Sequence, residues 1–96
     1  MGVDGEVTLH GTHICATSDD LARVTAGVLR HIALTRAEAG CLAFDVVQTA
    51  NPMIWAVSER FVDAAAFEAH QTRTAASDWA QLTAGIARDY KVAGLA

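Results

Sequence analysis

The feature that most constrains the fold is the order in which two kinds of apolar periodicity alternate along 96 residues. A repeat of two, typical of β-strands, occupies residues 6–15, 41–49, 54–61 and 87–92. A repeat of three to four, typical of helices, occupies residues 18–36 and the stretch after Asp63, with a short further helix after Ser77. This order predicts an α+β fold: a ferredoxin-like βαββαβ arrangement with an antiparallel four-stranded sheet and the helices on one face.

Local signals place the ends of the first helix. Ser18 offers a hydroxyl N-cap, and Asp19 and Asp20 bring carboxylates to the positive end of the helix dipole. Gly27 interrupts the helical pattern at a cost of about 1 kcal/mol relative to Ala, and we expect the helix to continue through it. Gly40 is expected to adopt the left-handed conformation that ends the helix.

Composition limits the classes of partner. With 52% hydrophobic and 19% charged residues, we expect one folded domain over residues 1–96, with a flexible terminus at residues 1–5. The net charge of −4 and the scattered basic residues argue against nucleic acid and against anionic membranes. No apolar run of about 20 residues and no basic, apolar leader occur, so we expect a cytoplasmic protein with no membrane association.

The bare face of the predicted sheet suggests a second subunit. Both faces of the strands carry apolar side chains, whereas the helices cover only one of them. Apolar surface of this extent is usually covered by another protein. The sequence therefore predicts a homodimer closed through the sheet faces.

Four ionisable side chains fall on apolar stripes, where a charge must be paired, neutralised or used. They are His13, Glu59, His70 and Arg88. Glu59 in an apolar pocket would have a raised pKa and accept a proton from a weakly acidic substrate. The alternative for Glu59 is an ion pair with Arg88 or Arg60, or contact with water at a dimer seam.

His70 allows two interpretations of the same kind. It would serve as a base, or as a donor that orients an oxygen on a bound ring. The alternative is a core histidine bonded to a backbone carbonyl. These two residues, His70 and Glu59, are the predicted catalytic pair.

No metal site is expected from the histidines and cysteines. His10 and His13 are three residues apart on a strand and face opposite ways, and His13 with Cys15 supplies too few ligands. Cys15 and Cys41 are expected to be reduced thiols. Because a glycine-rich phosphate loop is also missing from the sequence, we expect no dinucleotide cofactor.

A cleft between the sheet and the second helix would be lined by the aromatic residues that share these faces. Their alternative role is simply the core. The residues that we predict to bind a small aromatic ligand there are Trp55, Phe44, Phe67, His13, Trp79 and Tyr90.

Three short segments resemble the antibiotic biosynthesis monooxygenase (ABM) family. They are EAGCLAFDVV at residues 38–47, VSERF at residues 57–61 and FEAH at residues 67–70. The resemblance implies a dimeric αβ barrel with a pocket between sheet and helices in each subunit. Enzymes of this family include quinol and polyketide-anthrone monooxygenases that use no flavin, haem or metal. Phe61 stands where Trp is frequent, which argues against haem as a substrate.

The sequence and the resemblance together favour a cofactor-free monooxygenase. It would deprotonate a small phenol or hydroquinone, whose electron-rich anion then passes an electron to molecular oxygen. Two alternatives stay open. One is a non-redox isomerase or ligand-binding dimer on the same scaffold, and the other is a structural dimer whose clefts are filled by its own side chains.

Overall fold

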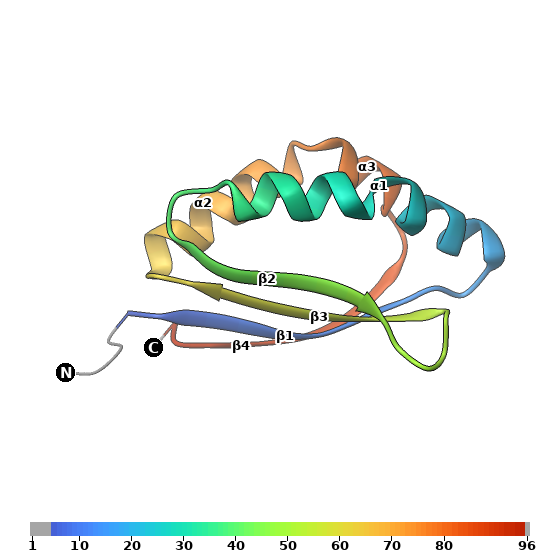
Figure 1. Cartoon of the computed structure of the whole chain (residues 1–96), viewed down its shortest axis with the longest axis horizontal. Helices are drawn as coiled ribbons and strands as arrows, with labels where there is room; N and C mark the ends of the chain where they lie inside the picture. The colour runs from blue at the N-terminus through green and yellow to red at the C-terminus, as the bar shows by residue number, and fades with distance from the viewer. Residues whose placement is uncertain (1–4, 96) are drawn as a thin grey trace.

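The computed structural model describes residues 5–95 and confirms the predicted order of elements. The expected flexible terminus therefore lies, for residues 1–4, outside the described residues. The sheet is antiparallel, with its strands in the order β2-β3-β1-β4, and the helices lie on one side of it (Figure 1). The elements are β1 (Val7–Ile14), α1 (Ser18–Arg36), β2 (Cys41–Gln48), β3 (Ile54–Phe61), α2 (Ala64–Ala75), α3 (Asp78–Leu82) and β4 (Ala87–Ala93).

The N-cap of α1 is Thr17, so the prediction of Ser18 was wrong. Thr17 has extended backbone angles, and its hydroxyl accepts a hydrogen bond from the backbone N–H of Asp20 at 3.1 Å. Ser18 is already helical. The carboxylate of Asp20 in turn accepts from the N–H of Ala16 at 2.9 Å, so the two side chains fix the start of the helix together.

The connection from α1 to β2 turns sharply at Gly40. The helix ends at Arg36, as expected, with Ala37 as its C-cap, and Gly40 carries the positive φ of +87° three residues after that cap. A Cβ on Gly40 would lie 2.6 Å from the Cβ of Ala66 in α2, so only glycine allows this approach. The turn therefore brings Glu38, which precedes it, close to α2.

The strand register places the buried side chains in one layer under the helices. Glu59 lies opposite Leu9 of β1 and Phe44 of β2, at the centre of the sheet. The two-residue repeat predicts that Leu42 shares the face of Phe44 and Val46, but Leu42 is exposed because a register shift between Cys41 and Ala43 interrupts the β2–β3 pairing. The core consists of Val7, Leu9, Cys15, Val24, Val28, Phe44, Val46, Trp55, Val57, Phe61, Phe67, Trp79 and Ile86.

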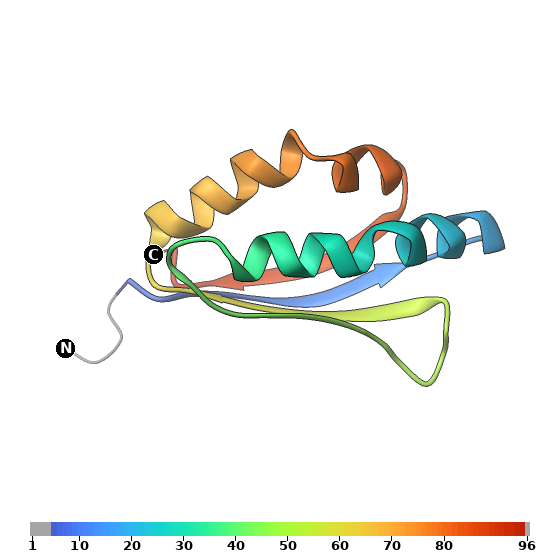
Figure 2. The same cartoon turned by 45° about the horizontal axis from the view of Figure 1, so that its top comes forward.

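The helices do not cover the sheet evenly. Figure 2 shows α2 starting close to the sheet and rising away from it toward its C-terminal end, where α3 follows. The opposite face of the sheet carries no helix, and the exposed apolar residues there include Ile14 and Val47. Within residues 5–95, no helix is both long and apolar enough for a membrane span.

Candidate active site

A cavity of about 280 Å³ lies between the sheet and the second half of α2, together with α3. Its floor comes from all four strands, and its roof from α1, α2 and α3. The exposed residues of the lining, Gln71, Ala75 and Arg88, place its mouth between α2 and β4. The complete lining is Leu9, His13, His31, Phe44, Val46, Val57, Glu59, His70, Gln71, Thr74, Ala75, Trp79, Ala80, Arg88 and Tyr90.

His70 is the most deeply buried ionisable residue of this lining, with 2% of its surface exposed. Its Nδ1 lies 3.0 Å from one carboxylate oxygen of Glu38 and 3.3 Å from the other. The second oxygen of Glu38 also accepts a hydrogen bond from Arg73 Nε, and Arg73 Nη2 donates to the hydroxyl of Thr35 at 2.9 Å. Glu38 is thus held as a carboxylate against His70 Nδ1.

This contact determines the tautomer of His70. A carboxylate only accepts hydrogen bonds, so Nδ1 must carry the proton, and Nε2 then presents a lone pair. The Nε2 atom lies 3.4 Å from Thr74 Oγ1 and 3.8 Å from Glu59 Oε1, both of which line the cavity. The imidazole is therefore oriented as a general base toward the cavity.

Burial keeps His70 neutral near pH 7. Desolvation lowers the pKa of its imidazole, the Glu38 carboxylate opposes this by raising it, and the charge of Arg73 lowers it again. A neutral imidazole with a fixed Nδ1–H is the form that accepts a proton at Nε2. The geometry and the charge state agree on the same role.

Glu59 is a buried carboxyl without a strong partner. It is 5% exposed, and its Oε1 has no hydrogen-bond partner among the described residues. Burial, followed by repulsion from Glu38, raises the pKa of Glu59 from 4.5 to about 7. Near neutral pH, Glu59 therefore exists in both its protonated and its ionised form.

The alternative partners expected for Glu59 do not reach it. Arg60 forms an ion pair with Glu6 at 3.1 Å, and Arg88 donates to the hydroxyl of Thr83 at 2.6 Å. Within residues 5–95, His70 is the nitrogen-bearing ionisable group that lies within 4 Å of the Glu59 carboxyl. An ion pair does not explain why the carboxyl is buried.

We expect Glu59→Gln to stabilise the protein at alkaline pH and to change its stability little at pH 5. Because the pKa of Glu59 is higher in the folded state than unfolded, the wild type loses stability as pH rises from about 4.5 to about 7. At pH 8 the amide avoids the cost of a buried charge, which predicts a gain of about 1–3 kcal/mol in unfolding free energy. Urea unfolding at pH 5 and pH 8 measures this difference, and an equal effect at both pH values would contradict it.

Four of the six residues predicted to bind a ligand lie in the cavity lining. Phe44 forms part of the floor, with its ring centroid 5.7 Å from that of His70. His13 and Tyr90 meet at the other end, with ring centroids 5.6 Å apart. Trp79 belongs to the roof of the cavity, and its ring centroid lies 5.7 Å from that of His13. Their role toward a ligand stays a prediction.

Trp55 and Phe67 lie outside the lining, contrary to expectation. Trp55 pairs with His13 across the strands, but at that end the cavity runs over β1 and β4 rather than over β3. Phe67 lies one helical turn before His70, where α2 approaches the sheet, and packs edge-on against Phe61 at 5.8 Å. Both residues are buried in the core.

Sequence reasoning missed three residues of the site. Glu38 and Arg73 hold His70, and His31 lines the cavity from α1 with 5% of its surface exposed. His31 had a usable signal, because it lies on the stripe of Val24 and Val28 at helical spacing. The meeting of Glu38 with α2 had no such signal, since it depends on the turn at Gly40.

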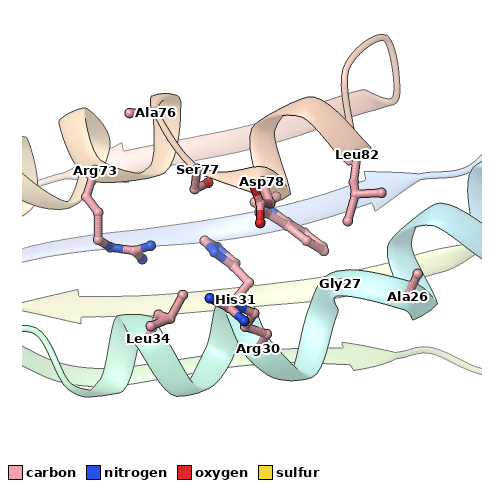
Figure 3. Close-up of a pocket in the computed structure, with 11 residues that line it drawn as sticks. Ala26, Gly27, Arg30, His31, Leu34, Arg73, Ala76, Ser77, Asp78 and Leu82 are labelled. Atoms are coloured by element: carbon pink, nitrogen blue, oxygen red, sulfur yellow. The ribbon is translucent and has the colours of Figure 1, made fainter.

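A second, larger compartment lies on the outer side of the roof. This outer groove of about 530 Å³ runs between α1 and the α2–α3 segment, and Figure 3 shows Arg73 reaching across it toward the side of α1 that carries His31 and Leu34. His31 and Trp79 line both compartments. Their rings stack with centroids 4.7 Å apart and planes at 4°, so this stack is the wall between the two spaces.

Gly27 lets α3 lie close to α1. A Cβ at this residue would lie 3.2 Å from Trp79 Cε3 and 2.7 Å from Leu82 Cδ1. The glycine that weakens α1 therefore allows α3 to pack closely on it. Among the residues described, the structure contains no group of three or more His, Cys, Asp or Glu side chains placed to hold a metal ion.

Comparisons with known proteins agree with this architecture. The model of the family described as antibiotic biosynthesis monooxygenase matches residues 12–82. Among solved structures, a putative antibiotic biosynthesis monooxygenase from Nitrosomonas europaea is 20% identical, covers 93% of this chain and 96% of its own, and superposes with a TM-score of 0.77. No curated protein matches the chain.

Two further structures show the same fold. SnoaB from Streptomyces nogalater, described as a cofactor-independent oxygenase, is 12% identical with a TM-score of 0.75, and the match covers 92% of this chain and 90% of SnoaB. PA3566 from Pseudomonas aeruginosa is 25% identical with a TM-score of 0.71, and the match covers 96% of this chain and 93% of PA3566. The matched residues 12–82 contain both His70 and Glu59, together with the elements that carry them. The chain belongs to the antibiotic biosynthesis monooxygenase family.

Proposed function

We propose that the chain is a monooxygenase that oxidises a small aromatic phenol or hydroquinone with molecular oxygen, using the 280 Å³ cavity as its active site. The observation that carries the proposal is the orientation of His70, whose Nδ1 is held by Glu38 and whose Nε2 faces the cavity. For a hydroquinone, one molecule of substrate and one of molecular oxygen give one hydroxyquinone and one water. One oxygen atom enters the product and the other leaves as water, and the substrate supplies all four electrons.

Proton removal is the first step of this proposal. His70 Nε2 takes the proton from the bound hydroxyl, and the imidazolium that forms is stabilised by the Glu38 carboxylate at 3.0 Å. The phenolate is electron-rich and passes an electron to oxygen, after which the radical pair combines to a peroxide. The protein supplies the base and a cavity that holds the substrate against it, while the substrate supplies the electrons.

Glu59 has the properties of a proton shuttle in the later steps. Its pKa of about 7 allows it to give or take a proton near neutral pH, and its Oε1 lies 3.8 Å from the nitrogen that accepts the substrate proton. Loss of water from the peroxide needs a proton on the leaving oxygen. A protonated Glu59 next to the imidazolium is a source for it.

The relatives support oxygen chemistry on this scaffold. SnoaB is described as a cofactor-independent oxygenase, and its fold covers nearly the whole of both chains. We extend this description to the present chain as part of the proposal. We also propose, from the sequence and the uncovered sheet face, a cytoplasmic location and a homodimer closed through that face. That face exposes Ile14 and Val47, and sedimentation of a monomer at micromolar concentration would remove the dimer from the proposal.

Oxygen uptake tests the proposal directly. With hydroquinones of one and two rings, we expect one molecule of oxygen consumed for each hydroquinone, at a rate well above that of the solution reaction. With oxygen gas labelled with ¹⁸O, mass spectrometry should find one labelled atom in the product and the other in water. Turnover without incorporation of the label would contradict the monooxygenase assignment.

A non-redox isomerase is the second candidate, because His70 and Glu59 also form an acid–base pair that can move a proton between two substrate atoms. The two groups lie 3.8 Å apart, and burial moves their pKa values in opposite directions. Reaction under argon discriminates the two functions. An isomerase keeps its rate without oxygen, whereas the monooxygenase stops.

A further inference from the structure

The wall between the cavity and the outer groove consists of two stacked rings. His31 of α1 and Trp79 of α3 are the residues that line both compartments, and their rings stack with centroids 4.7 Å apart and planes at 4°. Both are buried, with 5% of His31 and 6% of Trp79 exposed. Movement of either ring would join the cavity of about 280 Å³ to the groove of about 530 Å³.

Trp79 is the fixed half of this wall. Its ring packs on α1 at Gly27, where a Cβ would lie 3.2 Å from Trp79 Cε3. Its backbone carbonyl accepts a hydrogen bond from the hydroxyl of Thr83 at 2.8 Å, and its ring centroid lies 5.7 Å from that of His13. A large ring among close-packed neighbours has little space in which to turn. A passage through the wall would therefore open by movement of His31.

The ring of His31 is held mainly by contacts with other rings. Among residues 5–95, its buried Nδ1 has no hydrogen-bond partner. Besides Trp79, it contacts Phe44 edge-on at 5.3 Å, and its centroid lies 6.0 Å from that of His70. Burial, followed by the charges of His70 and Arg73, lowers the pKa of His31 to about 3, so the ring is neutral near pH 7. The ring can therefore leave the wall without carrying a charge through the protein.

The outer groove offers His31 a second position that satisfies its nitrogen. A buried nitrogen without a hydrogen bond is unfavourable by at least as much as the stacking of two rings is favourable. In the groove the same nitrogen would meet water, and Figure 3 shows Ser77 and Asp78 on the α3 side of this groove, where the exposed Asp78 carboxylate is an acceptor. The stacked and the swung-out positions of His31 are therefore close in free energy.

The wall lies on a different side of the cavity from its mouth. The mouth is between α2 and β4, whereas the wall is between α1 and α3. A ligand that enters through the mouth and fills the cavity blocks the mouth for a second reactant. A passage through the wall would stay accessible from the groove in that state.

We propose that the His31–Trp79 stack is a gate: His31 swings into the outer groove and opens a passage for molecular oxygen into a cavity whose mouth is blocked by the bound ligand. The gate follows from the packing of the wall, whereas its use by oxygen rests on the proposed function. His31 has no part in the proton transfers. Substitutions of His31 should therefore act through the size and polarity of the side chain and not through acid–base chemistry.

Relaxation dispersion of ring ¹H–¹⁵N groups tests the gate without any oxygen chemistry. We expect microsecond-to-millisecond exchange with one shared rate at the Trp79 indole and the His31 ring, and none at the Trp55 indole, which lies outside both linings. His31→Phe keeps a stacked ring and removes the unpartnered nitrogen, so the exchange at Trp79 should disappear. Ala33→Phe adds the same ring at an exposed site of α1 outside both compartments and should leave the exchange unchanged.

Steady-state rates at varied oxygen concentration test the passage. In His31→Phe we expect kcat/KM for oxygen to fall roughly 3- to 10-fold, with KM for the hydroquinone unchanged, because the closed gate limits oxygen entry. His31→Ala removes the ring and leaves the passage open, so its kcat/KM for oxygen should equal or exceed that of the wild type. Both variants lack the imidazole, so this difference between them would exclude an acid–base role of His31. Thermal melts confirm that each variant is folded.

The outcomes are distinct from those of the oxygen-uptake assay. No exchange at Trp79 in the wild type, exchange that persists in His31→Phe, or equal changes of kcat/KM for oxygen in the two variants overturns the inference. If His31→Ala does not fold, the wild type and His31→Phe decide the matter. Exchange that depends on His31, in a protein that consumes no oxygen with any hydroquinone, supports the gate and overturns the monooxygenase proposal alone.

Discussion

His70→Ala is expected to lower oxygen-dependent turnover of a hydroquinone by about 10²–10⁴-fold, the usual contribution of a positioned general base. The substitution removes the Nε2 lone pair that faces the cavity and leaves Glu38 paired with Arg73. The ligand is then no longer deprotonated in place, and oxidation relies on the small fraction of phenolate present in solution. Initial rates of oxygen uptake at pH 7 measure the effect.

The pH dependence of the rate provides a second readout. Because more phenolate forms in solution at higher pH, the residual rate of His70→Ala should keep rising with pH, whereas the wild-type rate should level off once His70 is neutral. Glu68→Ala, an exposed truncation on the same helix, is the matched control and should behave like the wild type. Equal rates for His70→Ala and the wild type would remove His70 from the mechanism.

Glu38→Gln is expected to lower turnover on the order of 100-fold while the protein stays folded. An amide presents a donor as well as an acceptor, so Nδ1 of His70 no longer has to carry the proton. Part of the population then holds the proton on Nε2, where it blocks the base. The imidazolium that forms during the reaction also loses the carboxylate that stabilises it.

The pH profile distinguishes this effect from a loss of packing. The Glu38 carboxylate raises the pKa of His70, so its removal should shift the acid limb of the profile to lower pH. Glu68→Gln makes the same chemical change at an exposed site of α2 and should alter neither the rate nor the profile. A Glu38→Gln enzyme with wild-type turnover would show that the Glu38–His70 contact has only a structural role.

The fold was predictable because its periodicities are long and do not overlap. Strands and helices differ in their apolar repeat, and the order of repeats along the chain leaves few topologies. Errors arose where a local contact decides the outcome. Thr17 rather than Ser18 caps α1, and a register shift exposes Leu42. Neither the choice of N-cap nor the register shift changes the apolar repeat of the sequence.

The sequence revealed those site residues that are ionisable but occupy positions where the apolar repeat predicts a buried side chain. Glu59 and His70 are ionisable residues on apolar stripes, and the structure places them 3.8 Å apart. Glu38 and Arg73 carry no such contradiction, since both look like ordinary polar residues in the sequence. Trp55 shares the strand face of Glu59 but lies four residues away, and a shared face does not fix the distance to a cavity.

The cavity lowers the stability of the protein that contains it. Among residues 5–95, Oε1 of Glu59 and the Nδ1 atoms of His13 and His31 are each removed from water without a hydrogen bond that replaces the one lost. Such groups cost about 1–3 kcal/mol each. The folding free energy of a small domain is only a few kcal/mol larger than these costs. Buried polar atoms without hydrogen bonds are therefore expected mainly at functional sites.

The protonation of the two His70 nitrogens is the measurement that tests the account most directly. A long-range ¹H–¹⁵N correlation spectrum of the protein at pH 7 reports which ring nitrogen carries the proton, and it needs neither oxygen nor turnover. We predict a protonated Nδ1 and a bare Nε2 in the free protein, with Nε2 gaining a proton when an acidic phenol binds under argon. A proton on Nε2 in the free protein, or an unchanged spectrum on binding, would contradict the role of His70 as the base.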